Sequence, residues 1–242
     1  MEYYNKIFDK FFNEHGFIGC HTNTSTEYLG IDFTYNKYGH RERDPQYFSD
    51  KEYILVGGCS VTEGIPTNVG DRYTSVLESL SGIPVYNIGL GSCGYDVIVR
   101  NIINWLHLNK NNKPIHVVTL MPSETRVIAK PKYRTSALDM IGAWSRSHEK
   151  FVALADMNGY FETNAILQYR NLKCVLELLN ISYTFITHYT YQVEENDEYA
   201  LTAPLFSEHS VAIDNIHPGE DWHKSMGVAL YHHLKSRNIG VN

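Results

Sequence analysis

Ser60, Asp214 and His217 are residue types that together carry out acyl transfer. Ser60 lies in a glycine-bounded segment, Gly-Cys-Ser-Val-Thr-Glu-Gly at 58–64, and the other two lie in Asp-Asn-Ile-His-Pro at 214–218. In this chemistry the serine hydroxyl attacks a carbonyl carbon, the histidine accepts its proton and the aspartate orients the imidazole. The Asp-x-x-His spacing within one loop lets the carboxylate reach Nδ1. The sequence therefore predicts Ser60 as nucleophile, His217 as base and Asp214 as the orienting acid.

Taken alone, Ser60 is better explained as the N-cap of a following helix, because serine is a favoured cap residue. The late Asp-x-x-His segment favours the nucleophile. So does a second glycine-rich segment, Asn-Ile-Gly-Leu-Gly-Ser at 87–92. Backbone N–H groups in such loops can receive the negative charge that develops on a carbonyl oxygen.

The elements that must position these residues alternate along the chain. Apolar runs predict strands over 53–56, 83–88, 115–121 and 181–187, and apolar periodicity predicts helices over 71–80, 95–108, 164–180 and 221–237. This order predicts parallel strands with helices on both faces of the sheet, and a ligand site at the carboxyl ends of the strands. Residues 1–50 show no sustained periodicity of apolar residues. We expect them to form an N-terminal extension, with a short helix over 2–12, packed on a main domain of 51–242.

In this order, the segments resemble the sequence blocks of the SGNH/GDSL hydrolase superfamily. The family's first block, Gly-Asp-Ser-x-x-x-Gly, is similar to 58–64, its Asn-x-Gly block to 87–89, and its Asp-x-x-His-Pro block to 214–218. The segment Asn-Lys-Tyr-Gly-His-Arg at 36–41 resembles a lead-in found in one branch of bacterial and phage members. The resemblance covers roughly residues 34–236.

The resemblance implies an α/β fold, namely a three-layer α/β/α sandwich around a mostly parallel, flavodoxin-like sheet. It implies an oxyanion hole built from the N–H groups of Ser60 and Gly89, and no cofactor. Two departures stand out. Cys59 replaces the aspartate of the first block, as in family branches with Gly-Cys-Ser, and the third block, Gly-x-Asn-Asp, is absent. By strand register the asparagine of that block falls on Ser123, whose shorter hydroxyl is the expected substitute donor.

Several residues have a second reading. Cys59 could itself be a nucleophile, but neighbours at a strand end point apart, so we expect it to pack beneath the turn. Arg126 follows the third strand and either binds a substrate carboxylate or phosphate as a bidentate pair or is a solvated loop residue. The remaining late histidines, at 209, 223, 232 and 233, show no ligand pattern such as His-Glu-x-x-His, so we expect structural roles and no metal.

Composition narrows the function classes. The chain has 242 residues, of which 43% are hydrophobic and 20% charged, and its formal net charge is −6. These values favour a globular protein with a large core, and the negative charge argues against nucleic acid as a partner. No apolar run is long enough to span a membrane. Four widely spaced cysteines and the lack of a signal-peptide pattern indicate a cytoplasmic location, or a virion if the protein is phage-encoded.

The sequence as a whole predicts a serine ester hydrolase that acts on a small-molecule or glycan ester. An O-acetylated carbohydrate, a small acyl ester and a lipid ester all remain open as substrates. The alternatives are an SGNH-fold binding or structural module with weak or no activity, and an O-acyltransferase. The sequence is silent on oligomeric state.

Overall fold

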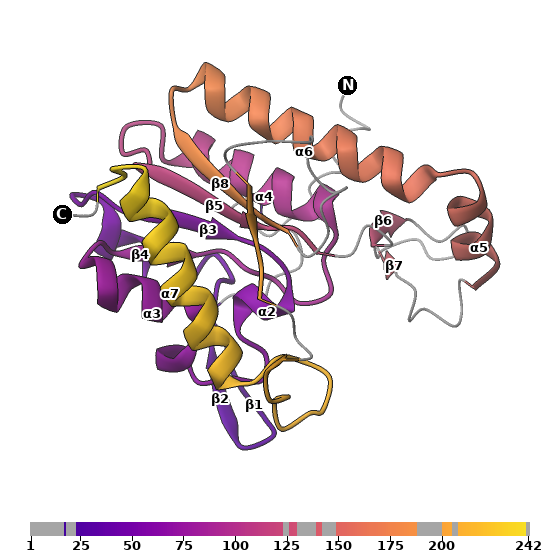
Figure 1. Cartoon of the computed structure of the whole chain (residues 1–242), viewed down its shortest axis with the longest axis horizontal. Coiled ribbons are helices and arrows are strands. Elements are labelled where there is room, and N and C mark those ends of the chain that lie inside the picture. Colours follow the sequence, from indigo (N-terminus) through magenta and orange to yellow (C-terminus); the bar gives the residue numbers. More distant parts are fainter. Residues whose placement is uncertain are drawn as a thin grey trace.

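A sheet of five parallel strands forms the centre of the computed structural model, in the order β4–β3–β5–β8–β9 (Figure 1). The strands are β3 (Ile54–Gly57), β4 (Val85–Asn87), β5 (His116–Leu120), β8 (Ser182–Thr187) and β9 (Ala200–Thr202). Every residue of β3, β4 and β5 is buried, as expected for strands covered on both faces. Numbered along the chain, this order is 2-1-3-4-5. The predicted flavodoxin-like sheet is therefore confirmed.

The structure describes Phe17 and residues 23–122, 126–129, 139–141, 149–187, 200–204 and 208–240. The helix predicted over 2–12 and the candidate oxyanion donor Ser123 lie outside the described residues.

Helices cover both faces of the sheet (Figure 1). On one face α3 (Tyr73–Ser81) packs against α7 (Glu220–Ser236), and on the other α4 (Tyr95–Leu108) packs against α6 (Tyr160–Leu178). Gly227 permits the first contact, because a Cβ at that position would lie 2.6 Å from Val76 Cβ. Helix α5 (Glu149–Met157) leads into α6, and the short α2 (Ser60–Glu63) follows β3. The three-layer α/β/α sandwich is confirmed.

No helix in the described part of the chain is both long and apolar enough to cross a membrane.

Element bounds agree with the sequence prediction within a few residues, and α4 agrees at both ends. Helix α6 starts at Tyr160, before the predicted residue 164, since Gly159 in the left-handed conformation (φ +63°) separates it from α5. Strand β9 was not predicted. It consists of three residues inside a long connection and is defined by its pairing with β8, which the local sequence does not reveal.

Smaller elements surround the sheet. Strands β1 (Ser25–Tyr28) and β2 (Ile31–Thr34) form one antiparallel pair, and β6 (Val127–Ala129) and β7 (Asp139–Ile141) form another. Two 3₁₀ helices, η1 (Pro45–Phe48) and η2 (Val69–Asp71), flank β3 in sequence. Phe17 and Phe48 belong to the main hydrophobic core, so these N-terminal residues pack on the sheet domain.

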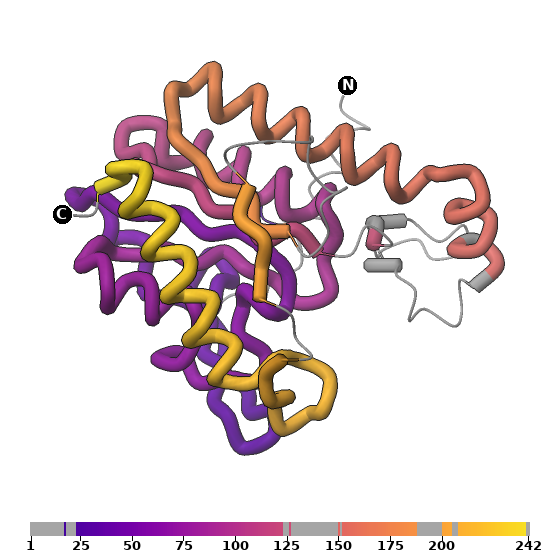
Figure 2. Tube along the Cα trace, viewed as in Figure 1, coloured from indigo at the N-terminus to yellow at the C-terminus, as the bar shows by residue number. Residues whose placement is uncertain are grey.

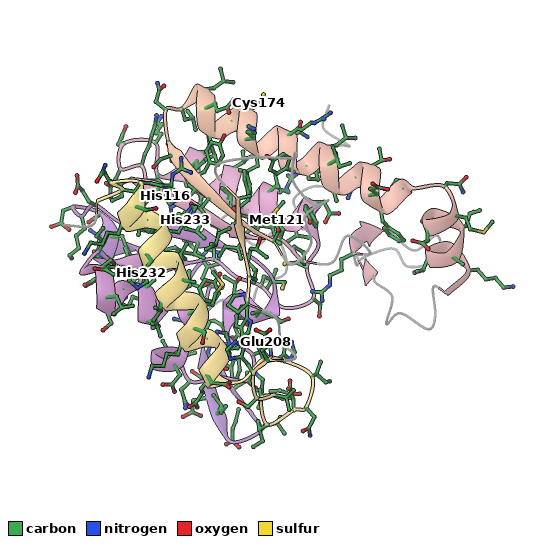
Figure 3. All side chains as sticks on the ribbon, in the orientation of Figure 1. His116, Met121, Cys174, Glu208, His232 and His233 are labelled. Carbon is green, nitrogen blue, oxygen red and sulfur yellow. The ribbon has the colours of Figure 1, made fainter. Side chains whose placement is uncertain are left out.

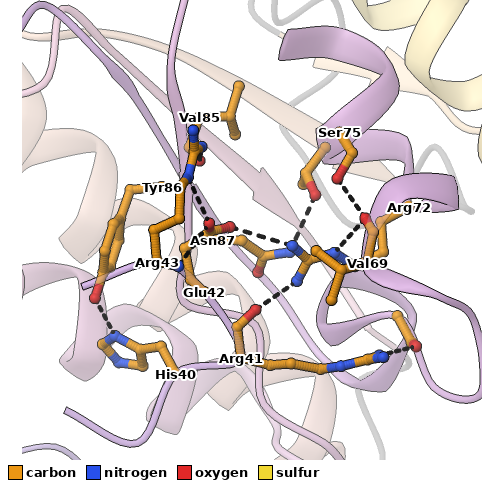
Figure 4. Close-up of polar contacts among 12 residues, drawn as sticks. His40, Arg41, Glu42, Arg43, Val69, Arg72, Ser75, Val85, Tyr86 and Asn87 are labelled. Atoms are coloured by element: carbon orange, nitrogen blue, oxygen red, sulfur yellow. Dashed lines mark hydrogen bonds and ion pairs between the residues drawn. The ribbon is translucent and has the colours of Figure 1, made fainter. Parts of the chain in front are cut away.

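Buried arginines tie the N-terminal segment to the chain that follows α2 (Figure 4). Arg72 is 1% exposed, donates to the Arg41 carbonyl oxygen at 2.7 Å and pairs with Glu42 at 3.2 Å. The Arg41 guanidinium in turn donates to the carbonyl oxygens of Gly64 and Thr67, at 2.7 and 2.8 Å. Charge-assisted hydrogen bonds of this kind are among the stronger contacts in a protein. They fix the exit of α2 relative to the N-terminal segment.

Candidate active site

Ser60 is the first residue of α2, directly after β3, and is 7% exposed. The turn depends on two glycines. A Cβ at Gly58 would lie 2.0 Å from Thr62 Oγ1, so only glycine fits there. Gly64 ends α2 in the left-handed conformation (φ +81°), with its N–H donating to the Ser60 carbonyl oxygen at 2.9 Å. The chain can therefore turn sharply and present the Ser60 hydroxyl at the carboxyl end of the sheet.

His217 and Asp214 lie on a narrow loop that precedes α7. The loop is closed by a hydrogen bond from the N–H of Ala212 to the carbonyl oxygen of His217, at 2.8 Å. Asn215 sits within it in the left-handed conformation (φ +56°). Asp214 Oδ1 accepts the N–H groups of Ile216 and His217, both at 3.0 Å. One oxygen of the carboxylate thus holds the backbone of its own loop, and the other is left to bind the imidazole.

The three predicted residues form one hydrogen-bonded chain. His217 Nδ1 lies 2.6 Å from Asp214 Oδ2, and His217 Nε2 lies 2.9 Å from Ser60 Oγ. Because an ionised carboxylate only accepts, Nδ1 carries the proton and Nε2 of the neutral ring accepts from the hydroxyl. This is the tautomer that a general base for Ser60 requires. Figure 2 shows how α7 and its preceding loop return to the early part of the chain.

The Asp214 side chain is only 3% exposed. Burial by itself would raise the pKa of this carboxyl group. Hydrogen bonds from the backbone and ring of His217 and from the N–H of Ile216 outweigh it, so the pKa of Asp214 is lowered from its ordinary value. Asp214 is therefore ionised at neutral pH and can stabilise a positive charge on the imidazole.

No known family model and no curated protein sequence matches this chain. Solved structures do. TesA matches with a TM-score of 0.52 at 11% identity, over 76% of this chain and 99% of its own. The esterase EstA from Pseudoalteromonas sp. matches with a TM-score of 0.50 at 11% identity, over 77% and 98%. A family two carbohydrate esterase from Clostridium thermocellum matches with a TM-score of 0.51 at 12% identity, over 78% and 65%.

The chain has the SGNH/GDSL hydrolase fold. Within this fold Ser60 follows β3, which lies between β4 and β5 and so stands where the strand order reverses. Ligands in open α/β sheets bind in the crevice at that point.

The SGNH fold brings the loop at 87–92 beside α2, and its N–H groups differ in what they bind. Gly89, the predicted oxyanion donor, already donates to Asn87 Oδ1 at 2.8 Å, and Gly91 donates to Glu63 Oε2 at 2.5 Å. Ser92 is exposed, has a left-handed backbone (φ +61°), and its N–H has no acceptor among the described residues. The N–H of Ser60, in the first turn of α2, is likewise without one in this part of the chain.

Asn87 is a structural residue of the site that the sequence reading passed over. It is 2% exposed, and its Nδ2 donates to the carbonyl oxygen of Thr62 at 2.6 Å and to Thr74 Oγ1 at 3.2 Å. With the bond from Gly89, its amide joins the end of β4 to α2 and α3. The sequence feature that could have indicated this role is the position of Asn87 at the start of the Asn-x-Gly segment.

Arg126 lies close to this loop. Its carbonyl oxygen is 2.1 Å from the position of a Cβ on Gly94, so its backbone packs against the residue that precedes α4, and its side chain is partly buried. Ser123 lies outside the described residues.

Cys59 is 4% exposed and, as expected, packs beneath the turn. Cys93 is fully buried and donates its thiol to the Leu90 carbonyl oxygen at 2.8 Å, and both cysteines are free thiols. Burial raises the pKa of the Cys93 thiol, which keeps it protonated and unreactive.

The other histidines differ in their burial and contacts. His223 is fully buried, stacks parallel to the Tyr73 ring and accepts the Tyr73 N–H at 3.3 Å, and burial lowers its pKa to about 4. His233 faces the sheet near His116, whereas its neighbour His232 is exposed (Figure 3). Among the described residues, no three His, Cys, Asp or Glu side chains gather to hold a metal ion.

Proposed function

We propose that the chain is a serine ester hydrolase that works through an acyl-enzyme. One observation carries the proposal: Ser60, His217 and Asp214 form a continuous hydrogen-bonded chain in the order that acyl transfer needs. The names of two structures with the same fold support it, since EstA and the Clostridium thermocellum protein are both esterases.

The first half-reaction forms the Ser60 ester. The hydroxyl oxygen attacks the substrate carbonyl carbon while its proton passes to His217 Nε2, and the carbonyl π electrons move onto the oxygen. When this tetrahedral species collapses, the bond to the leaving oxygen breaks and His217 returns the proton to that oxygen. Asp214 stabilises the imidazolium that exists between the two proton transfers. In the second half-reaction water takes the place of the serine hydroxyl and releases the acid.

The oxyanion needs donors beside Ser60. The N–H groups of Ser60 and Ser92 support this role because neither has an acceptor in the described part of the chain. Gly89 would have to give up its bond to Asn87 before it could join them. A side-chain donor from Ser123 remains a proposal that rests on strand register.

Three aliphatic side chains support a substrate with an apolar acyl group. Val211, Ile213 and Ile216 lie on the His217 loop and are 59%, 64% and 77% exposed. Exposed apolar side chains on the loop that carries the proposed base offer an acyl chain a surface to cover. The carbohydrate esterase with the same fold keeps an acetylated sugar as the second candidate substrate class.

The test is a panel of p-nitrophenyl esters from acetate to octanoate together with acetylated oligosaccharides, plus labelling by a fluorophosphonate. Hydrolysis with label on Ser60 supports the proposal. Binding of substrate without hydrolysis or label favours a non-catalytic module. Label on Ser60 with turnover only when a sugar acceptor is added favours an O-acyltransferase.

A further inference from the structure

Glu63 is a buried carboxylate at the end of the nucleophile turn. It is the last residue of α2 and is 3% exposed. Its Oε1 accepts the hydroxyl of Tyr35 at 2.8 Å, and its Oε2 accepts the N–H of Gly91 at 2.5 Å. It therefore joins three segments: the N-terminal segment, the nucleophile turn and the glycine-rich loop.

Burial of a carboxylate in this position costs desolvation free energy. Burial raises the pKa of Glu63, and the bonds from Tyr35 and Gly91 and the positive charges of Arg41 and Arg72 only partly oppose this rise. The buried thiol of Cys93 is another titratable group near Glu63. A neutral or apolar side chain would avoid the desolvation. What the Glu63 side chain supplies and an apolar side chain would lack is two hydrogen bonds, one to each of two different segments.

The backbone shows what those bonds control. Helix α2 lies directly on the loop, because a Cβ at Gly89 would be 2.4 Å from the N atom of Glu63. The bond from Gly91 then fixes the residue that immediately precedes Ser92. Ser92 holds a left-handed backbone (φ +61°), which is unfavourable for a residue with a Cβ and persists only when its surroundings impose it.

We propose that Glu63 is a positioning residue that holds the loop at 89–92 so that the N–H of Ser92 points toward the oxyanion site beside Ser60. This inference rests on the proposed function. Glu63 acts through Gly91 and does not touch the substrate. Its loss should weaken an interaction made mainly in the transition state, which lowers kcat and leaves KM nearly unchanged.

The test compares two variants of Glu63. Glu63→Ala removes both acceptors. Glu63→Gln keeps an acceptor for Gly91, and its amide N–H can donate to a reoriented Tyr35 hydroxyl, so only the charge is lost. With p-nitrophenyl acetate, Glu63→Ala should lower kcat by about 10- to 100-fold, less than removal of a direct oxyanion donor, with KM within about threefold. Glu63→Gln should restore kcat to within a few-fold of the wild type.

Glu78→Ala is the matched control. Glu78 also accepts a side-chain donor and a backbone N–H, from Arg43 at 2.8 Å and from Val85 at 2.7 Å, but at the opposite end of β4 from the loop. This variant should lower the melting temperature without changing kcat. Equal losses of kcat in Glu78→Ala and Glu63→Ala would reduce the effect to general destabilisation and overturn the proposal.

Hydrogen exchange gives a readout that does not need activity. Amides of the segment 88–93 should exchange faster in Glu63→Ala than in the wild type, Glu63→Gln or Glu78→Ala. Unchanged exchange, or a kcat within twofold of the wild type, would refute the positioning role. If the wild-type protein neither hydrolyses esters nor labels at Ser60, the proposed function fails, while the exchange rates still decide whether Glu63 orders the loop.

Discussion

At the scale of single residues, Ser60 and Cys59 offer two nucleophiles one position apart, and the structure treats them differently. Ser60 Oγ contacts the His217 imidazole, whereas Cys59 is buried beneath the turn, and in the described part of the chain its thiol makes no hydrogen bond to a base. A thiol or hydroxyl becomes a strong nucleophile only when a base can take its proton. The proposed nucleophile is therefore the Ser60 oxygen.

Ser60→Ala should abolish fluorophosphonate labelling and lower ester hydrolysis by at least about 10³-fold, because no other described hydroxyl contacts His217 Nε2. Mass spectrometry of the labelled protein locates the adduct, and circular dichroism checks the fold. Cys59→Ala is the control and should keep both label and activity. A label that persists in Ser60→Ala and moves to Cys59 would disprove the assignment.

Asp214 should contribute less to the rate than His217. In the proposed mechanism Asp214 orients the imidazole and stabilises its positive charge, and neighbouring groups and water can partly replace these functions. The proton acceptor at His217 Nε2 has no such substitute. We expect Asp214→Ala to retain at least about tenfold more activity than His217→Ala. Initial rates with p-nitrophenyl acetate measure this. Equal losses in the two variants would mean that Asp214 does more than orient the ring.

At the scale of elements, the site depends on close contact between α2 and the loop that follows β4. Gly89 is the point of closest approach, and Asn87 and Glu63 bond across it from either side. This packing leaves no room for a side chain.

Gly89→Ala should destabilise the fold by about 1–3 kcal/mol, as overpacking of a tight contact generally does. It should also lower kcat, because α2 carries Ser60. Gly70→Ala is the matched control, since a Cβ there meets nothing within 4 Å. That change should be neutral or slightly stabilising. Urea unfolding measures both variants, and equal stability would show that α2 can move away from the loop freely.

At the scale of the whole molecule, three buried histidines make stability depend on pH. Burial lowers the pKa of His40 to about 3, that of His116 to about 3 and that of His223 to about 4, from an ordinary value of 6.5. Between these values and 6.5 the unfolded chain binds more protons than the folded one. The contribution of these histidines to the free energy of unfolding is therefore fully present above about pH 6.5 and is lost as the pH is lowered. The raised pKa of Glu63 has the opposite effect on the pH dependence of stability, but Glu63 is one group, whereas the buried histidines are three.

The free energy of unfolding should fall by several kcal/mol between pH 6.5 and 5, at up to about 1.4 kcal/mol per pH unit for each histidine. Urea unfolding at several pH values measures the slope. His223→Gln should reduce the slope by about one proton, since a glutamine oxygen can accept the Tyr73 N–H that His223 accepts. His232→Gln, at an exposed position, should leave it unchanged. A stability that is flat over this range would show that the buried rings are protonated in the folded state.

The sequence by itself determined the α/β class, four of the five strands of the sheet and the segments that carry Ser60, Asp214 and His217. These features are local: apolar runs and periodicity define the elements, and glycine spacing marks the turns. Strand β9 was not predicted, because it is defined by its pairing with β8, and the local sequence does not reveal that pairing.

The tertiary structure alone decided which N–H groups face which acceptors. The family resemblance implied that Gly89 is an oxyanion donor, yet its N–H donates to Asn87 Oδ1, and the N–H of Ser92 is left without an acceptor among the described residues. The proposed role of Glu63 likewise depends on the contact between α2 and the loop at 89–92, which the sequence does not reveal. Such assignments depend on how the backbone of one segment packs against that of another. Residue types fix which donors and acceptors exist, and only the packed backbone fixes how they pair.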